Sequence, residues 1–275
     1  MMKIAISGKG GAGKTTLSAL LATAMAIKGH RVVAIDADPD ANLAAALGLS
    51  PDNHPEFLAE MGDLIAERTG AKNAYGGYFK LNPRVEDIPE RFSRRIGSIR
   101  LLALGGVPRG GAGCICPASS LIKALLTHLL LGSDDAVVMD MEAGIEHLGR
   151  ATTRSMHALV TVVDQGPWSI QTALRVRRLA GDIGLENVVA VVNGTAPGTD
   201  LEAIGKRLDG IPIAGVLPYD PRLPEAIVAG ADHQELRPTD VLSELLPAIE
   251  HLLQRLQASS REAESERCAA PTRGE

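Results

Sequence analysis

The residues best suited to chemistry lie near the amino terminus, in a glycine-rich stretch that fits the pattern GxxxxGK[ST]. The stretch follows an apolar run and precedes a run with apolar residues at helical spacing. Glycines allow a tight turn that points backbone N–H groups inward, and the amino end of the helix adds partial positive charge where phosphates bind. The sequence therefore predicts a nucleotide site formed by Gly8, Lys9, Gly10, Gly11, Ala12, Gly13, Lys14, Thr15 and Thr16.

Three side chains of this loop are expected to contact the phosphates or their metal ion. Lys14 should reach the β- and γ-phosphates, the Thr15 hydroxyl should bind the bridging Mg²⁺, and Thr16 should contact the α-phosphate. The alternative, a glycine-rich turn without a ligand, is disfavoured because the motif and its setting between strand and helix agree. We therefore expect ATP and Mg²⁺ as ligands.

Carboxylates follow two further apolar runs. Asp36, Asp38 and Asp40 follow the second run, and Asp140 ends the run that begins at Ala136. Ligands of parallel sheets gather at the carboxyl ends of the strands, so these side chains should lie beside the phosphate loop. Asp140 fits a Walker B carboxylate that holds Mg²⁺, and Gly144 stands where a second switch could sense the γ-phosphate. A turn rich in Asp and Pro is the alternative for the first group.

A cysteine pair occupies a second glycine-rich loop. Cys114 and Cys116 form a CxC motif just before a helical stretch over 119–131. One chain supplies two thiolates, whereas Zn²⁺ usually takes four ligands, so a two-fold partner would complete the site. Four thiolates in a tetrahedron favour Zn²⁺ and a square plane favours Ni²⁺, so the metal stays open. Buried packing and a local disulfide are the competing explanations.

The elements that position these residues follow from the apolar runs. Short strands are expected over 3–7, 31–35, 99–104, 136–139, 159–163, 188–192 and 211–217, and each is followed by a loop or a helical stretch such as 14–28. This alternation predicts an α/β fold, a mainly parallel twisted sheet with helices on both faces. The 45% hydrophobic and 3% aromatic content suits strands that are covered on both sides.

We expect one domain over 1–257, with an insertion or flap over 50–98, where the pattern weakens, and a disordered tail over 258–275. The helical spacing over 241–256 indicates a helix that packs on the core rather than a membrane anchor. The net charge of −5 argues against nucleic acid as a partner. No signal peptide or membrane span is recognisable, and three cysteines suit reduced thiols, so we expect a cytoplasmic protein.

The second lysine of the phosphate loop makes the motif resemble the deviant Walker A family of MinD, ParA, the nitrogenase iron protein and CooC. That resemblance implies a homodimer with ATP, in which Lys9 reaches the nucleotide of the partner chain. It also implies that Asp38 orients the attacking water and that Asp36 lies near the Mg²⁺ shell. Asn193 and Pro218 stand where relatives hold the adenine, although Gly194 replaces a lysine that many relatives carry.

Within that family the chain is most similar to the CooC-type ATPases. The shared features are the CxC pair, the Asp36–Asp40 segment, and the stretches 81–83, 140–148 and 217–219. The resemblance implies a cycle in which ATP closes the dimer, Ni²⁺ or Zn²⁺ is held between the subunits, and hydrolysis opens the dimer for delivery. The client would be a nickel enzyme similar to carbon monoxide dehydrogenase.

Two other functions compete with metal delivery. A positioning ATPase similar to MinD or ParA would bind membrane or DNA, and an iron–sulfur carrier similar to the nitrogenase iron protein would use well-separated cysteines. The basic cluster of Arg91, Arg94, Arg95 and Arg100 could dock an acidic partner, although a solvated face explains it as well. The expected active-site roles are therefore catalysis by Lys9, Lys14 and Asp38, and Mg²⁺ binding by Thr15, Asp36 and Asp140.

Overall fold

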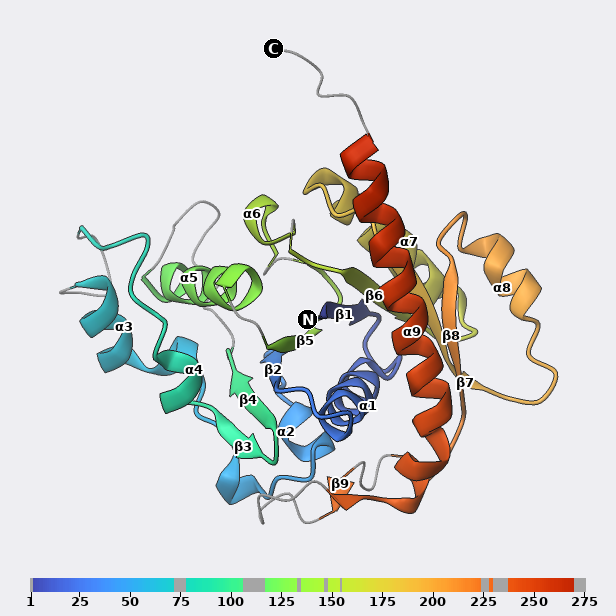
Figure 1. The fold of residues 1–275 in the computed structure, drawn as a ribbon, viewed down its shortest axis with the longest axis horizontal. Coiled ribbons are helices and arrows are strands. Elements are labelled where there is room, and N and C mark those ends of the chain that lie inside the picture. The colour runs from blue at the N-terminus through green and yellow to red at the C-terminus, as the bar shows by residue number, and fades with distance from the viewer. Residues whose placement is uncertain are drawn as a thin grey trace.

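A computed structural model describes residues 2–71, 78–105, 117–132, 135–145, 148–153, 155–223, 228–229 and 237–269. Its centre is an eight-stranded sheet in the order β3-β4-β2-β5-β1-β6-β7-β8 (Figure 1). All neighbouring strands run parallel except β3, which pairs antiparallel with β4 at one edge. The strands are β1 (Lys3–Gly8), β2 (Val32–Ala37), β3 (Arg94–Ile96), β4 (Ile99–Ala103), β5 (Ala136–Met141), β6 (Ala158–Val163), β7 (Val188–Thr195) and β8 (Ile213–Pro218).

Helices cover both faces of this sheet. The longer ones are α1 (Lys14–Ile27), α3 (Gly62–Thr69), α5 (Pro117–Gly132), α7 (Pro167–Asp182), α8 (Leu201–Arg207) and α9 (Asp240–Ala269). The shorter ones are α2 (Leu43–Ala46), α4 (Ile88–Arg91), α6 (Arg150–Thr153) and two 3₁₀ turns, η1 (Pro51–Asn53) and η2 (Leu58–Glu60). A two-stranded hairpin, β9 (Val228–Ala229) with β10 (Arg237–Pro238), precedes α9.

Two apolar clusters, one on each face, bury the sheet. Side chains of α1, α2 and α9 form one cluster, and side chains of α3, α5, α7 and α8 form the other. Successive strand residues alternate between them: Ile4 and Ile6 of β1 belong to the first cluster, and Ala5 belongs to the second. The expected parallel α/β fold is confirmed, because strands buried on both faces read as the continuous apolar runs seen in the sequence.

The described part of segment 50–98 packs against the second cluster. Leu58, Leu64, Val85 and Ile88 are all buried there. Arg68 joins its two halves, because the guanidinium donates to both carboxylate oxygens of Asp87 at 2.9 and 2.7 Å. This segment therefore buries apolar surface of its own against the sheet.

Helix α9 continues well past residue 257, where we expected disorder to begin, and ends at Ala269 (Figure 1). The continuation has contacts that composition does not reveal. Ser260 is buried, and the Asn187 side-chain amide donates to the Ser259 hydroxyl at 3.2 Å. Residues 270–275 lie outside the described part of the chain. Among the helices that are described, none combines the length and apolarity needed to cross a bilayer.

Candidate functional site

The phosphate loop connects β1 to α1 as expected. Gly11 and Gly13 have φ angles of 78° and 94°, a left-handed conformation that glycine adopts without strain. The Ala12 N–H donates to the Lys9 carbonyl at 3.1 Å and closes the turn. Any Cβ on Gly13 would lie 2.1 Å from the Asn193 side-chain nitrogen, so glycine is needed there for space as well as for backbone angle.

Beside this loop, Asp36 and Asp140 face each other in register on the neighbouring strands β2 and β5. Asp36 accepts backbone N–H groups from Asp38 at 3.2 Å and from Leu43 at 2.8 Å. Burial nevertheless raises the pKa of Asp36 to about 6, because those bonds only partly offset the loss of water around the carboxylate.

Asp140 lies at the centre of the site and is fully buried. Neither of its carboxylate oxygens has a hydrogen-bond partner within the described structure. Burial raises the pKa of Asp140 to about 7, the Asp36 charge adds to the rise, and the nearby Thr15 hydroxyl and Lys14 ammonium oppose it. Buried carboxylate oxygens without a partner are costly unless a cation or a proton satisfies them.

The donor set fits Mg²⁺, which prefers oxygen ligands and keeps several waters. Asp140 would hold the ion directly or through water, Thr15 would add its hydroxyl, and Asp36 would lie close by as expected from the sequence. When bound, Mg²⁺ neutralises charge on the β- and γ-phosphates of the nucleotide.

Lys14 and Asp38 also meet at this site. The Lys14 ammonium is buried and lies 4.0 Å from the Asp38 carboxylate. Asp38 is 18% exposed, so it can still reach a water molecule beside the phosphate loop. Lys9 is half-buried, and no ion pair holds its ammonium within the described residues. The structure thus brings Lys14, Asp36, Asp38 and Asp140 together and leaves Lys9 partly exposed.

The second switch begins directly after β5. The Gly144 N–H donates to the Glu142 carbonyl at 2.8 Å, and the Ser7 hydroxyl donates to the carbonyls of Glu142 and Gly144 at 3.1 Å each. Contact between the Gly144 N–H and a γ-phosphate would therefore require this short turn to open. Ser7 was not singled out in the sequence, because a serine inside an apolar strand gives no signal of a loop partner.

The expected base side is built from the ends of β7 and β8. The Asn193 amide donates to the Ala12 carbonyl at 2.8 Å, which ties β7 to the phosphate loop. The register between the two strands shifts just after Asn193, where Gly194 has a φ of 69°. Pro218 ends β8, and the following Tyr219 N–H donates to the Thr195 carbonyl at 2.9 Å.

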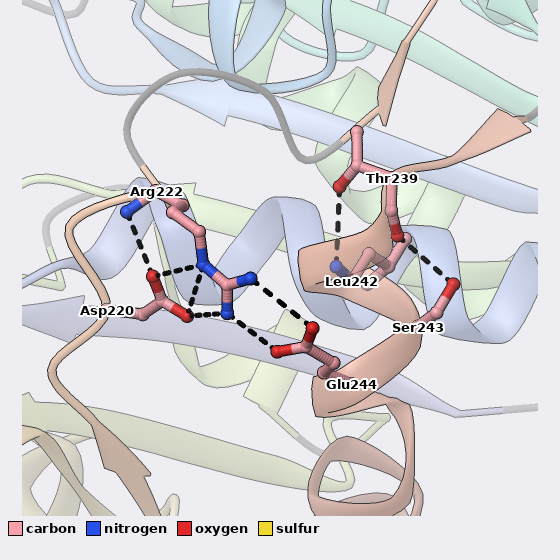
Figure 2. Close-up of polar contacts among 6 residues, drawn as sticks. All are labelled: Asp220, Arg222, Thr239, Leu242, Ser243 and Glu244. Atoms are coloured by element: carbon pink, nitrogen blue, oxygen red, sulfur yellow. Dashed lines mark hydrogen bonds and ion pairs between the residues drawn. The ribbon is translucent and has the colours of Figure 1, made fainter.

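An ion-pair network next to Pro218 has no counterpart in the sequence analysis (Figure 2). Arg222 contacts Asp220 and Glu244 at once, with Nη2 2.6 Å from a carboxylate oxygen of each. Glu244 is far from the other two in sequence and belongs to α9, so only the fold reveals this contact.

The cysteine pair cannot be placed in the same way. Cys114 and Cys116 lie outside the described residues, as do Glu146 and His147. Within the described ranges, no group of three or more His, Cys, Asp or Glu side chains could hold a metal ion. Metal binding by the CxC motif stays a prediction.

Comparison with known proteins identifies the family of the chain. Residues 3–232 match the model of the CobQ/CobB/MinD/ParA nucleotide binding domain. The chain is 43% identical over 239 residues to the carbon monoxide dehydrogenase accessory protein CooC of Rhodospirillum rubrum, covering 86% of this chain and 91% of that protein. It is 42% identical over 222 residues to an uncharacterized ATP-binding protein of Methanocaldococcus jannaschii, covering 80% and 86% of the two chains.

Solved structures agree on the fold. The MinC:MinD cell division complex of Aquifex aeolicus includes a chain that aligns with a TM-score of 0.59 at 24% identity, over 96% of both chains. A ParA family ATPase from Chlorobium tepidum gives 0.57 at 18% identity, over 94% of this chain and 95% of that one. With the phosphate loop, the paired carboxylates and the matched domain in place, this chain is an ATPase that belongs to the CobQ/CobB/MinD/ParA nucleotide-binding family.

Proposed function

We propose that this ATPase is a nucleotide-switched, dimeric metallochaperone that assists nickel insertion into an enzyme of the carbon monoxide dehydrogenase type. The observation that carries the proposal is the similarity to the carbon monoxide dehydrogenase accessory protein CooC, which extends over most of both chains. The Cys114-x-Cys116 pair adds soft thiolate ligands suited to a carried Ni²⁺ or Zn²⁺ ion.

Hydrolysis follows from the geometry of the loop and its carboxylates. Lys14 is held beside Asp38 at 4.0 Å, so the ammonium can meet the β- and γ-phosphates while the carboxylate orients a water molecule. Asp140 and Thr15 hold the charge-neutralising Mg²⁺. Lys9 is half-buried, and no ion pair holds its ammonium among the described residues, which suits contact with the nucleotide of a second chain.

Dimer formation and metal binding are linked because each chain supplies only half of the thiolate ligands that a metal site needs. Two thiolates from each of two chains make the four ligands that a closed Zn²⁺ site requires, and the same four could surround Ni²⁺ in a plane. ATP bound between the chains would bring the two cysteine pairs together. Hydrolysis would separate them and release the ion to the client enzyme.

The direct test is a titration with Ni²⁺ and with Zn²⁺, combined with gel filtration, with and without a nonhydrolysable ATP analogue. We expect about one ion per dimer for the native protein, and strong loss of binding for Cys114→Ala/Cys116→Ala. The matched control is Cys268→Ala, which removes a thiol outside the CxC motif and should bind metal normally. Equal metal binding by the double variant and the native chain would refute metal delivery through this motif.

A further inference from the structure

The network of Arg222 lies between the turn that ends β8 and helix α9 (Figure 2). The Arg222 backbone N–H donates to Asp220 at 2.9 Å, and the side chain donates to both oxygens of the same carboxylate, with Nε 3.0 Å from Oδ1 and Nη2 2.6 Å from Oδ2. The guanidinium also donates to both oxygens of Glu244, at 2.6 and 3.3 Å. One guanidinium thus bridges two carboxylates through several N–H donors, a fork of donors that a lysine ammonium does not have.

Helix α9 gives this bridge a fixed anchor. Thr239 caps the helix: its hydroxyl accepts from the Leu242 N–H at 3.3 Å, and its carbonyl accepts from the Ser243 hydroxyl at 3.1 Å (Figure 2). Leu242 and Leu245, on either side of Glu244, are buried in the cluster shared with α1. Glu244 therefore projects from a helix whose position is set by the core.

The other end of the bridge leads to the nucleotide loop. Asp220 directly follows Pro218 and Tyr219, and the Tyr219 N–H is bonded to Thr195 on β7. Two residues earlier on β7, Asn193 donates to the Ala12 carbonyl of the phosphate loop. Any shift of the turn formed by Pro218, Tyr219 and Asp220 would change the surface that faces a bound base beside that loop.

We propose that Arg222 is a positioning residue for the nucleotide base: by bridging Asp220 to Glu244 it holds the 218–220 turn in place. It thereby sets the affinity for ATP and the preference for ATP over GTP. This inference rests on the proposed ATP-driven function, with the base site at Asn193 and Pro218 as the family resemblance implies. Arg222 acts through the turn and does not contact the phosphates.

The strength of the Arg222 bridge depends on how far its side chains are exposed to solvent. The side chains of Arg222 and Glu244 are 51% and 60% exposed, so solvent screens the bridge and its effect is modest. The network lowers the pKa of Asp220, first through the Arg222 side chain, and lowers the pKa of Glu244 for the same reason. Both carboxylates therefore stay ionised at neutral pH, and the bridge weakens when salt screens the charges.

The test compares Arg222→Gln, Glu244→Gln and Arg222→Lys in the full-length protein. We expect the two glutamine variants to raise KM for ATP, and the Kd of a fluorescent ATP analogue, about two- to fivefold with kcat unchanged. The ratio of kcat/KM for ATP over GTP should fall in both, and Arg222→Lys should recover part of the loss. The difference from the native protein should shrink in about 1 M salt, where screening removes the ionic contribution.

The control is Lys206→Gln, which breaks an exposed pair with Glu202 of 2.7 Å on α8, away from the turn. It should leave both constants unchanged. Unaltered KM and Kd in Arg222→Gln would overturn the inference, and so would a fall in kcat at constant KM. KM for ATP and the Kd of the ATP analogue are measured without a transition metal. A protein that binds nucleotide but no such metal would therefore refute metal delivery, and the role of Arg222 would still be decided by these two constants.

Discussion

At the scale of single residues, the site contains a carboxylate whose buried position costs energy without a ligand. Asp140 is buried, has no hydrogen-bond partner among the described residues, and faces Asp36 across the strands. Such a group favours whatever supplies positive charge, either a proton or a metal ion. The pKa of Asp140 is raised to about 7, which means that the buried carboxyl group binds a proton more tightly than an exposed one does.

This arrangement makes the stability of the nucleotide-free protein depend on pH. The folded chain keeps a proton on Asp140 up to about pH 7, whereas the unfolded chain loses it near pH 3.8, the ordinary pKa of an aspartate side chain. Between those values the folded state binds more protons, so the contribution of Asp140 to stability falls as pH rises from about 4 to about 7.

Asp140→Asn should therefore stabilise the protein without nucleotide and Mg²⁺ at pH 8, by on the order of 2 kcal/mol. The gain should shrink at pH 5 and disappear only below about pH 4, where the carboxyl is neutral in both the folded and the unfolded chain, and ATPase activity should be lost at every pH. Thermal unfolding at the two pH values measures this.

Asp87→Asn is the matched control for that measurement. The Arg68 side chain lowers the pKa of Asp87, so this carboxylate stabilises the fold at neutral pH and loses that effect as pH falls. The variant should be destabilised at pH 8. An Asp140→Asn variant that behaves like Asp87→Asn would show that Asp140 is satisfied in the folded protein.

Gly13→Ala should abolish tight nucleotide binding, because the new Cβ would lie 2.1 Å from the Asn193 amide at a φ of 94°. Isothermal titration with ATP and Mg²⁺ should show a loss of affinity of at least about tenfold. Gly198→Ala introduces similar backbone strain, at a φ of 86° in open space, and should bind ATP normally. Similar affinity in both variants would mean that the contact with Asn193 is unimportant.

At the scale of elements, the sequence predicts the strands of the sheet better than it predicts helix α9, which packs on the first apolar cluster. Parallel strands buried on both sides are apolar throughout, so runs such as 136–139 indicate them without further information. Strand β3 was missed because it is short, exposed at two of three positions, and paired only at an edge. The continuation of α9 was missed because its sequence is polar and because the contact that Ser259 makes comes from Asn187, far away in sequence.

The packing of α9 on β8 is testable through Leu252. This side chain is 1% exposed, and its Cδ1 would lie 3.1 Å from a Cβ on Gly215, so helix and strand are in close contact. Leu252→Ala should lower the free energy of unfolding by about 2–5 kcal/mol in denaturant titration. Leu131→Ala, at a position 51% exposed, should cost much less. Equal losses would contradict this packing.

At the scale of the whole molecule, strand order explains how distant residues form one site. Strand β1 lies between β5 and β6, and β2 pairs with β5, so the loop after β1 lies beside the carboxylates that end β2 and β5. The motifs predicted these neighbours, because carboxyl ends of parallel strands share an edge. The bridge from Arg222 to Glu244 could not be predicted, since it depends on where α9 crosses the sheet.

Catalysis across two chains predicts a specific kinetic result for Lys9. Lys9→Ala should bind ATP and Mg²⁺ with little change but should lose at least about tenfold in kcat, because its cation would act on the nucleotide of the partner. Lys206→Ala removes a lysine far from the loop and should keep full activity. Normal turnover by Lys9→Ala would exclude catalysis in trans.

In the proposed cycle ATP joins two chains, and the joined chains hold one metal ion. Native mass spectrometry with a nonhydrolysable ATP analogue, Mg²⁺ and Ni²⁺ or Zn²⁺ reads all three components at once. We expect a species with two chains, two nucleotides and one transition-metal ion, and we expect this species to be absent without nucleotide. A nucleotide-loaded monomer, or a dimer that carries no such ion, would contradict it.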